Sequence, residues 1–206
     1  MYALVVNNSI TRVFPGPKGF EHNGNQYSPD IFYKWSKAEK EAIGLYEVTT
    51  DSTNYKDTKW YINTNESFAF ANNTVTRSWG TATAKAHADT LWTQQDSDDG
   101  DLPDDKEVGD VKVEGLKTQL IRTIKQQAAG ILQNTDWYIV RKADAGTAVP
   151  SSITTHRAAV RTKAASMETA ITNAADTPAL ETLYTYTEQE DGSLARPLGE
   201  LPILES

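Results

Sequence analysis

The sequence predicts an α+β protein with a β-rich N-terminal half, a short helix within it, and a helical C-terminal half. Three observations lead to this fold class. Short β-rich runs alternate with turn residues before residue 95, acidic residues crowd the middle of the chain, and apolar residues recur every three to four positions afterwards. We therefore expect a β-rich domain at 1–95, an acidic flexible linker at 96–112, a helical region at 113–176 and an extended tail at 177–206.

The first half of the chain contains several runs of β-branched and aromatic residues. Tyr2–Val6 and Ile10–Phe14 are separated only by Asn7-Asn8-Ser9, which predicts a tight β-hairpin. With 206 residues and 38% hydrophobic content, the chain can bury one sizeable core or two small ones. Further strands are expected at Leu45–Thr49, Lys59–Ile62, Ser67–Ala71 and Val75–Trp79, and Trp35, Trp60, Trp79 and Trp92 are expected in the core.

Two helices are expected within this half. The first is short and covers residues 36–44, where Ser36 can cap the N-terminus and Glu39 completes a capping box. Gly44 suits the left-handed residue that ends such a helix. The second is expected at Thr81–Thr93, which is rich in alanine.

Residues 96–110 form the most acidic segment of the chain. They contain eight acidic residues and one lysine, so they carry most of the net charge of −8. Because the segment has few apolar residues, it cannot bury enough surface to offset its ordering entropy, and we expect a mobile linker. The rest of the chain is nearly neutral and offers no basic field for a phosphate backbone, so nucleic acid is not an expected partner.

The acidic segment partly matches a calcium-binding loop. Asp96, Asp98, Asp104 and Glu107 fall at the first, third, ninth and twelfth positions of that frame. Gly100, however, falls one position before the place that the loop requires for glycine. We therefore favour a solvated linker and predict no metal site, with weak calcium binding by clustered carboxylates left as an alternative.

The second half changes to a helical period. Apolar residues spaced three to four apart predict an amphipathic helix from Val113 to Gln133. Tyr138–Arg141 is expected to be a short strand or an extended piece, and Leu183–Tyr186 is expected to be a strand within the extended tail.

A second long helix is expected after Pro150, with Ser151 or Ser152 as its cap. Its apolar line suits the core of a monomer and the seam of a homo-oligomer equally well, so self-association is left open. The line consists of Ile153, His156, Val160, Ala164, Met167 and Ile171.

The residue types that carry catalysis are sparse. The chain has no cysteine, and its three histidines at 22, 87 and 156 stand apart from one another. The common nucleophile, phosphate-loop, dinucleotide and zinc motifs are absent from the sequence. We therefore expect no enzyme and no cofactor. A sugar-active or hydrolytic domain in the first half is the weaker alternative, since no pair of carboxylates supports it.

Membrane association is not expected either. No apolar run approaches the length of a membrane-spanning helix. Residues 1–6 are apolar, but they have no basic residue before them and Asn7 ends the run, which is typical of a first strand rather than a secretory signal.

Residues 135–161 contain the strongest candidate for a binding surface. Trp137 follows a predicted helix end, where it is expected either to pack as an anchor against the next helix or to act as a partner hot spot, and core packing is the favoured interpretation. Arg157 and Arg161 are four residues apart and share a helix face with one another. Together with Arg141 they can hold an anionic group, although a solvated helix flank is the simpler interpretation.

The same stretch resembles a known family. The C-terminal signature of tail fibre assembly proteins of tailed bacteriophages is similar to a series of residues in this stretch, which are, in order, Thr135-Asp136-Trp137, Arg141, Gly146, Val149-Pro150, Arg157 and Arg161. These are also described as tail assembly chaperones. His156 stands where the family pattern has tyrosine. The resemblance implies a non-enzymatic protein that binds a tail fibre or another tail protein, and the implied partner-binding residues are Asp136, Trp137, Arg141, His156, Arg157 and Arg161.

Two roles are compatible with this resemblance. In the first, the protein assists the assembly of a tail subunit in the host cytoplasm and then leaves. In the second, it stays as a structural component of the virion tail or of the fibre attachment site. Temporary and permanent partner surfaces use the same residue types, so the sequence alone does not separate these roles.

Overall fold

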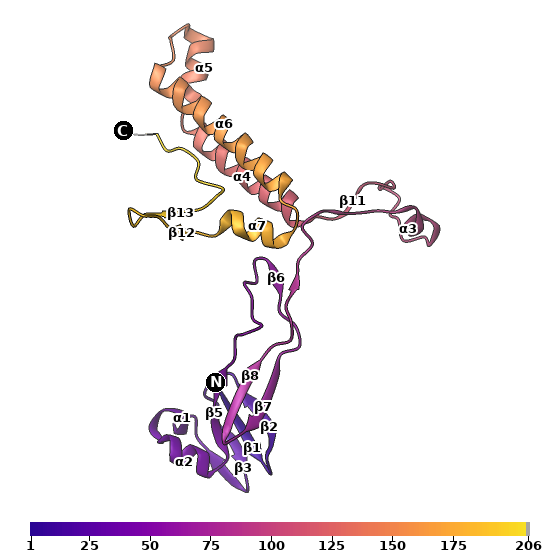
Figure 1. The fold of residues 1–206 in the computed structure, drawn as a ribbon, viewed down its shortest axis with the longest axis vertical. Coiled ribbons are helices and arrows are strands. Elements are labelled where there is room, and N and C mark those ends of the chain that lie inside the picture. Colours follow the sequence, from indigo (N-terminus) through magenta and orange to yellow (C-terminus); the bar gives the residue numbers. More distant parts are fainter. Residues whose placement is uncertain (205–206) are drawn as a thin grey trace. The chain divides into compact units, whose positions relative to one another are not determined.

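The computed structural model describes residues 1–204 (Figure 1). The chain divides into two compact units, Met1–Thr83 and residue 84 onward. Most strands lie in the first unit and the long helices lie in the second, which confirms the α+β class. The predicted boundary at residue 95 is wrong, because residues 85–89 already belong to the helical unit: the amide of Leu116 donates to the carbonyl of Ala86 over 3.0 Å.

A five-stranded sheet forms the first unit. Its strand order is β2-β1-β5-β8-β7, and all neighbours are antiparallel except β5 and β8. The edge strands β2 and β7 also contact each other, so the sheet curls on itself. The strands are β1 (Tyr2–Val6), β2 (Ser9–Phe14), β5 (Leu45–Thr50), β7 (Ser67–Ala71) and β8 (Thr74–Ser78).

The hairpin predicted at the N-terminus is confirmed. β1 pairs with β2 through a turn in which Asn7 and Asn8 have φ angles of 50° and 60°. Asparagine tolerates this left-handed conformation, which matches the twist of the two strands. The remaining short strands of this unit and its boundary are β3 (Phe20–His22), β4 (Asn25–Tyr27), β6 (Tyr61–Ile62) and β9 (Thr83–Ala84).

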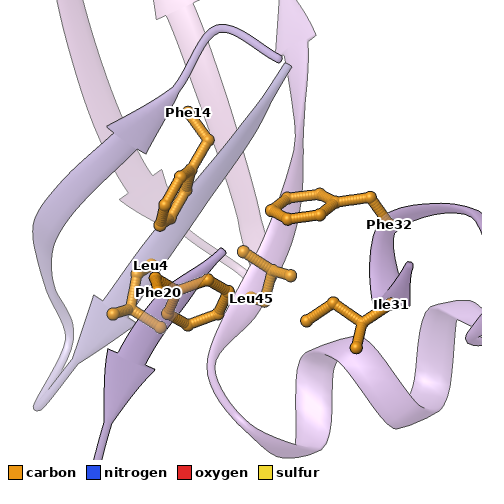
Figure 2. Close-up of a cluster of buried hydrophobic side chains, with 6 residues drawn as sticks. All are labelled: Leu4, Phe14, Phe20, Ile31, Phe32 and Leu45. Carbon is orange, nitrogen blue, oxygen red and sulfur yellow. The ribbon is translucent and has the colours of Figure 1, made fainter. Parts of the chain in front are cut away.

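The sheet has an apolar cluster on each face, because successive side chains of a strand point to opposite sides. Figure 2 shows the cluster between the sheet and α1 (Ile31–Lys34). The opposite face buries Ala3, Val5 and Val75, which places them inside the curled sheet. Of the four tryptophans expected in the core, Trp60 is buried and the other three are half-buried. The first cluster consists of Leu4, Phe14, Phe20, Ile31, Phe32 and Leu45.

The short helix α2 (Lys37–Ala42) forms as its capping residues predict. The backbone amide of Ser36 donates to the Glu39 carboxylate over 2.8 Å, and the Ser36 hydroxyl accepts from the Glu39 amide. Gly44 follows with φ at 80°. The prediction of a helix at Thr81–Thr93 is wrong, because this stretch contains β9 and β10 (Thr90–Leu91). Between these strands, the carbonyls of Ala86 and His87 accept hydrogen bonds from the first amides of α4.

Two long antiparallel helices dominate the second unit. α4 (Leu116–Gln133) packs along α6 (Ser151–Asn173), as Figure 1 shows. The apolar line predicted for the second helix is buried within one chain, so it serves the monomer core. The predicted serine cap is wrong, because Pro150 occupies the N-cap position and no side chain caps α6. No described helix is both long and apolar enough to cross a membrane.

The acidic segment and the C-terminal residues differ from their predicted form. The acids at 96–110 lie between β10 and β11 (Val111–Val113), which pair with each other, and α3 (Gln94–Asp98) overlaps their start. They therefore form a loop between two paired strands of the second unit and not a linker between units.

The predicted extended tail begins with a helix, α7 (Thr177–Tyr184), because Asp176 caps it and Leu180 is fully buried. Within residues 185–204, β12 (Thr187–Glu188) and β13 (Leu194–Ala195) follow as a small hairpin.

Candidate partner-binding site

The candidate site is built on α5 (Asp136–Ala145), which lies at one end of the α4–α6 pair (Figure 1). The strand expected at Tyr138–Arg141 is wrong, since these residues are helical. Gly146 ends the helix with φ at 68°, and its amide donates to the Lys142 carbonyl over 3.0 Å. None of the ten residues of α5 is buried, so the helix is attached to the unit mainly through its first turn.

Arg157 of α6 holds that first turn in place. Its guanidinium donates to the Leu132 carbonyl and to the Thr135 hydroxyl, each over 2.7 Å, and contacts the Asp136 carboxylate over 2.8 Å. Arg157 and Thr135 are both buried, whereas the Asp136 side chain is half exposed. A buried charged group that is paired and hydrogen-bonded is costly to displace. The side chain of Arg157 thus fixes the corner between α4 and α5 and is not exposed to a partner, and its partner-binding role stays a prediction.

Trp137 presents its indole ring on the outer side of this corner. The residue is 51% exposed, and the Arg141 guanidinium lies 4.7 Å from the ring centroid and 5.4 Å from that of Tyr138. An arginine one turn after a tryptophan stacks on it through a cation–π contact. The Arg141 Nε atom is buried and has no hydrogen-bond partner within residues 1–204. Together the ring and the guanidinium form a flat, partly apolar surface.

Val140 extends this surface and was not foreseen from the sequence. It is 65% exposed and lies three residues after Trp137, on the same side of the helix. We call Trp137, Val140 and Arg141 the α5 surface. Ile139 is 43% exposed but lies two residues after Trp137, on another side of the helix. Val140 was missed because a Tyr-Ile-Val run is typical of a strand that faces a core.

His156 and Arg161 lie outside the α5 surface. His156 is 8% exposed and contributes to a separate groove at the start of α6. Arg161 is exposed, and its guanidinium makes one long contact of 3.5 Å to the Arg157 carbonyl. Of the six predicted partner-binding residues, the structure thus places Asp136, Trp137 and Arg141 together on α5.

The residues of this site can contribute to non-covalent binding. Throughout residues 1–204, no group of three or more His, Asp or Glu side chains could hold a metal ion. The Asp96 carboxylate, which would open a calcium loop, is instead bound to Lys112 and Thr93. The α5 surface consists of an exposed aromatic ring, a guanidinium and one aliphatic side chain, and tryptophan and arginine are enriched in protein–protein hot spots.

Comparison with known proteins identifies no relative. No protein-family model, curated protein or solved structure matches this chain. The likeness to tail fibre assembly proteins therefore stays a prediction from the motif at residues 135–161.

Proposed function

We propose that the chain is a non-enzymatic protein of a tailed bacteriophage that binds a tail fibre or another tail protein through the α5 surface and assists its assembly. The observation that carries this proposal is the exposure of Trp137 and Val140 on a helix without a single buried residue. The phage assignment is supported by the family motif in the same residues.

Exposed apolar side chains usually stand alone on a monomer surface and need no explanation. Trp137 and Val140 differ because they lie next to each other on one face of a ten-residue helix. An isolated helix of this length is marginal in water, and α5 gains little from apolar burial in its own unit. A partner that covers the α5 surface would supply the missing burial.

The clamp by Arg157 makes this surface suitable for binding. Because Arg157 fixes Thr135 and Asp136, the direction in which α5 leaves α4 is set before any partner arrives. A surface that is already ordered loses less conformational entropy on association. Trp137 stacked under Arg141 is likewise held in one orientation, and such aromatic–arginine pairs contribute disproportionately to affinity.

The test is a binding measurement between the purified chain and the tail fibre or tail proteins of its own phage, using calorimetry. Trp137→Ala should weaken binding by about 30-fold or more, the loss expected for a central hot spot. Tyr33→Ala is the matched control, because Tyr33 is a 76% exposed aromatic residue in the first unit. Equal affinity of the Trp137 variant and the control would contradict the α5 surface as the binding site.

Quantitative mass spectrometry of mature particles and of the infected-cell lysate separates the two roles. An assembly factor should be abundant in the lysate and missing from particles. A fixed ratio of this chain to tail proteins in the particles would make it a structural component instead.

A further inference from the structure

The two-stranded ribbon formed by β10 and β11 has an exposed apolar face. Leu91 lies directly opposite Val111, and Val113 follows two positions later in the same strand. Residues that are opposite each other in an antiparallel pair share a face, and so do residues two apart in one strand. Val113 is 60% exposed, and Leu91 and Val111 are 45% and 44% exposed. We call these three residues the ribbon face.

The opposite side of the ribbon is occupied by a polar contact. Lys112 and Trp92 each follow a residue of the ribbon face by one position, so their side chains point the other way. The Lys112 ammonium lies 4.3 Å from the centroid of the Trp92 ring and is bound to the Asp96 carboxylate. These contacts hold the ribbon together from one side and leave its aliphatic side chains on the other.

The ribbon face is suited to docking. A two-stranded ribbon is marginally stable in water unless a further strand or a helix covers one of its faces. Here all five residues of β10 and β11 are exposed. Neighbouring apolar side chains that are exposed and rimmed by polar residues mark interaction sites, because a partner that covers them gains hydrophobic free energy.

The loop that joins the two strands carries the charge that selects the partner. Residues 96–110 contain eight acids and one lysine, a net charge of −7. Within residues 1–204 only two of these acids form an ion pair, Asp96 with Lys112 and Asp105 with Lys106, which leaves six carboxylates without a cationic partner. One of the six, Asp110, belongs to the ribbon itself, because its carbonyl accepts from the Trp92 amide over 2.8 Å.

This charge decides between possible occupants. Two copies of the chain that met through their ribbon faces would bring two loops of −7 together, and an anionic lipid surface would likewise be repelled. A segment with basic residues next to aliphatic ones complements both features of the ribbon. We propose that the ribbon face docks a segment of another protein in which an aliphatic run adjoins lysine or arginine. The α5 surface takes no part, so this proposal does not depend on the tail-protein assignment.

The test is a titration of the ¹⁵N-labelled full chain, followed by NMR, with the probe acetyl-Val-Leu-Val-Lys-Lys-amide. The amide signals of residues 90–92 and 110–113 should shift and saturate. Replacing both lysines of the probe by glutamate, or its three aliphatic residues by serine, should each weaken binding by at least about 10-fold. No saturating shift at about 10 mM probe, saturation elsewhere in the chain, or equal binding of either altered peptide would overturn the proposal.

A double variant locates the site. Val111→Thr combined with Val113→Thr keeps the β-branched shape but makes the ribbon face polar, and it should weaken the probe by about 10-fold. Both valines are exposed, so the fold should persist, which circular dichroism checks. Ile62→Thr is the control, because Ile62 is a 51% exposed strand residue of the first unit, and it should leave binding unchanged.

Full affinity of the double variant for the probe would contradict docking on the ribbon face. Sedimentation of the unmodified chain tests the choice of occupant. The chain should show no concentration-dependent association through this face. A dimer that the double variant abolishes would make a second copy the occupant and overturn the choice of a basic partner.

Discussion

Arg157 of α6 donates a 2.7 Å hydrogen bond to the hydroxyl of Thr135, and both residues are buried. This contact ties the second turn of α6 to the point where α4 ends and α5 begins. The first residues of the family-like motif therefore have a structural task, and they present Trp137 outward as a result. Burial therefore distinguishes the motif residues that stabilise the fold from those that a partner can contact.

The first prediction concerns this clamp. Arg157→Met should destabilise the helical unit by about 2–3 kcal/mol, because the Leu132 carbonyl and the Thr135 hydroxyl lose a buried donor. Urea unfolding followed by helical circular dichroism measures the change. Arg161→Met is the matched control and should stay within about 0.5 kcal/mol, since Arg161 is exposed. Equal stability of the two variants would contradict the clamp.

The second prediction concerns the attachment of α4. A Cβ atom added at Gly115 would lie 2.3 Å from the Ala88 backbone, and the Gly115 amide donates to Asp89 over 2.7 Å. Gly115→Ala should therefore destabilise the unit by more than about 2 kcal/mol. Gly130 lies within the same helix with open space around it, so Gly130→Ala should stabilise by about 0.5–1 kcal/mol. Thermal unfolding of both variants should show shifts of opposite sign.

The third prediction tests the first unit. Gly44 has φ at 80°, and a Cβ atom there would lie 2.4 Å from the Val5 carbonyl oxygen. Gly44→Ala should cost about 2 kcal/mol or more, since strain and a backbone clash add. Gly16→Ala meets nothing within 4 Å and should change stability by less than about 0.5 kcal/mol. Urea unfolding followed by near-ultraviolet circular dichroism of the aromatic core measures the stability of both variants. A Gly44→Ala variant as stable as the unmodified chain would contradict the close approach of residue 44 to the Val5 carbonyl.

The fourth prediction concerns pH. The hydrogen bond from Lys112, followed by those from Thr93, lowers the pKa of Asp96 from 3.8 to about 2. Because the folded pKa lies below the unfolded one, the stabilising effect is fully present above pH 3.8 and is lost as the pH falls towards 2. In an NMR titration of the side-chain carboxyl carbons, Lys112→Gln should raise the pKa of Asp96 towards 3.8. Lys106→Gln, in the same acidic segment, should leave it unchanged.

Elements with local signals could be predicted from the sequence. The capping box of α2 and the asparagine turn between β1 and β2 depend on residues only a few positions apart. The 3–4 spacing of α4 and α6 is similarly local. Thr81–Thr93 was mispredicted because its alanine content favours a helix, whereas the Ala86 and His87 carbonyls accept hydrogen bonds from the start of α4. That contact joins distant segments and has no signature in the sequence.

The candidate site was predicted only in part. Asp136, Trp137 and Arg141 were expected to act together, and they do lie on one helix. That helix was not expected, because the β-branched residues at 139 and 140 are typical of a strand. The burial of Arg157 was also missed. A charged residue on a helix is usually solvated, and the three partners of Arg157 belong to the end of α4 and the start of α5, more than twenty residues earlier in the chain.

Site-specific photo-crosslinking during infection tests the central claim most directly. p-Benzoylphenylalanine would replace Val140 on the α5 surface or, as the control, Tyr33 in the first unit, and crosslinked proteins would be identified by mass spectrometry. We predict that position 140 captures a tail fibre or another tail protein and that position 33 does not. Crosslinks from position 140 to no tail protein, or equal capture from both positions, would contradict binding through α5.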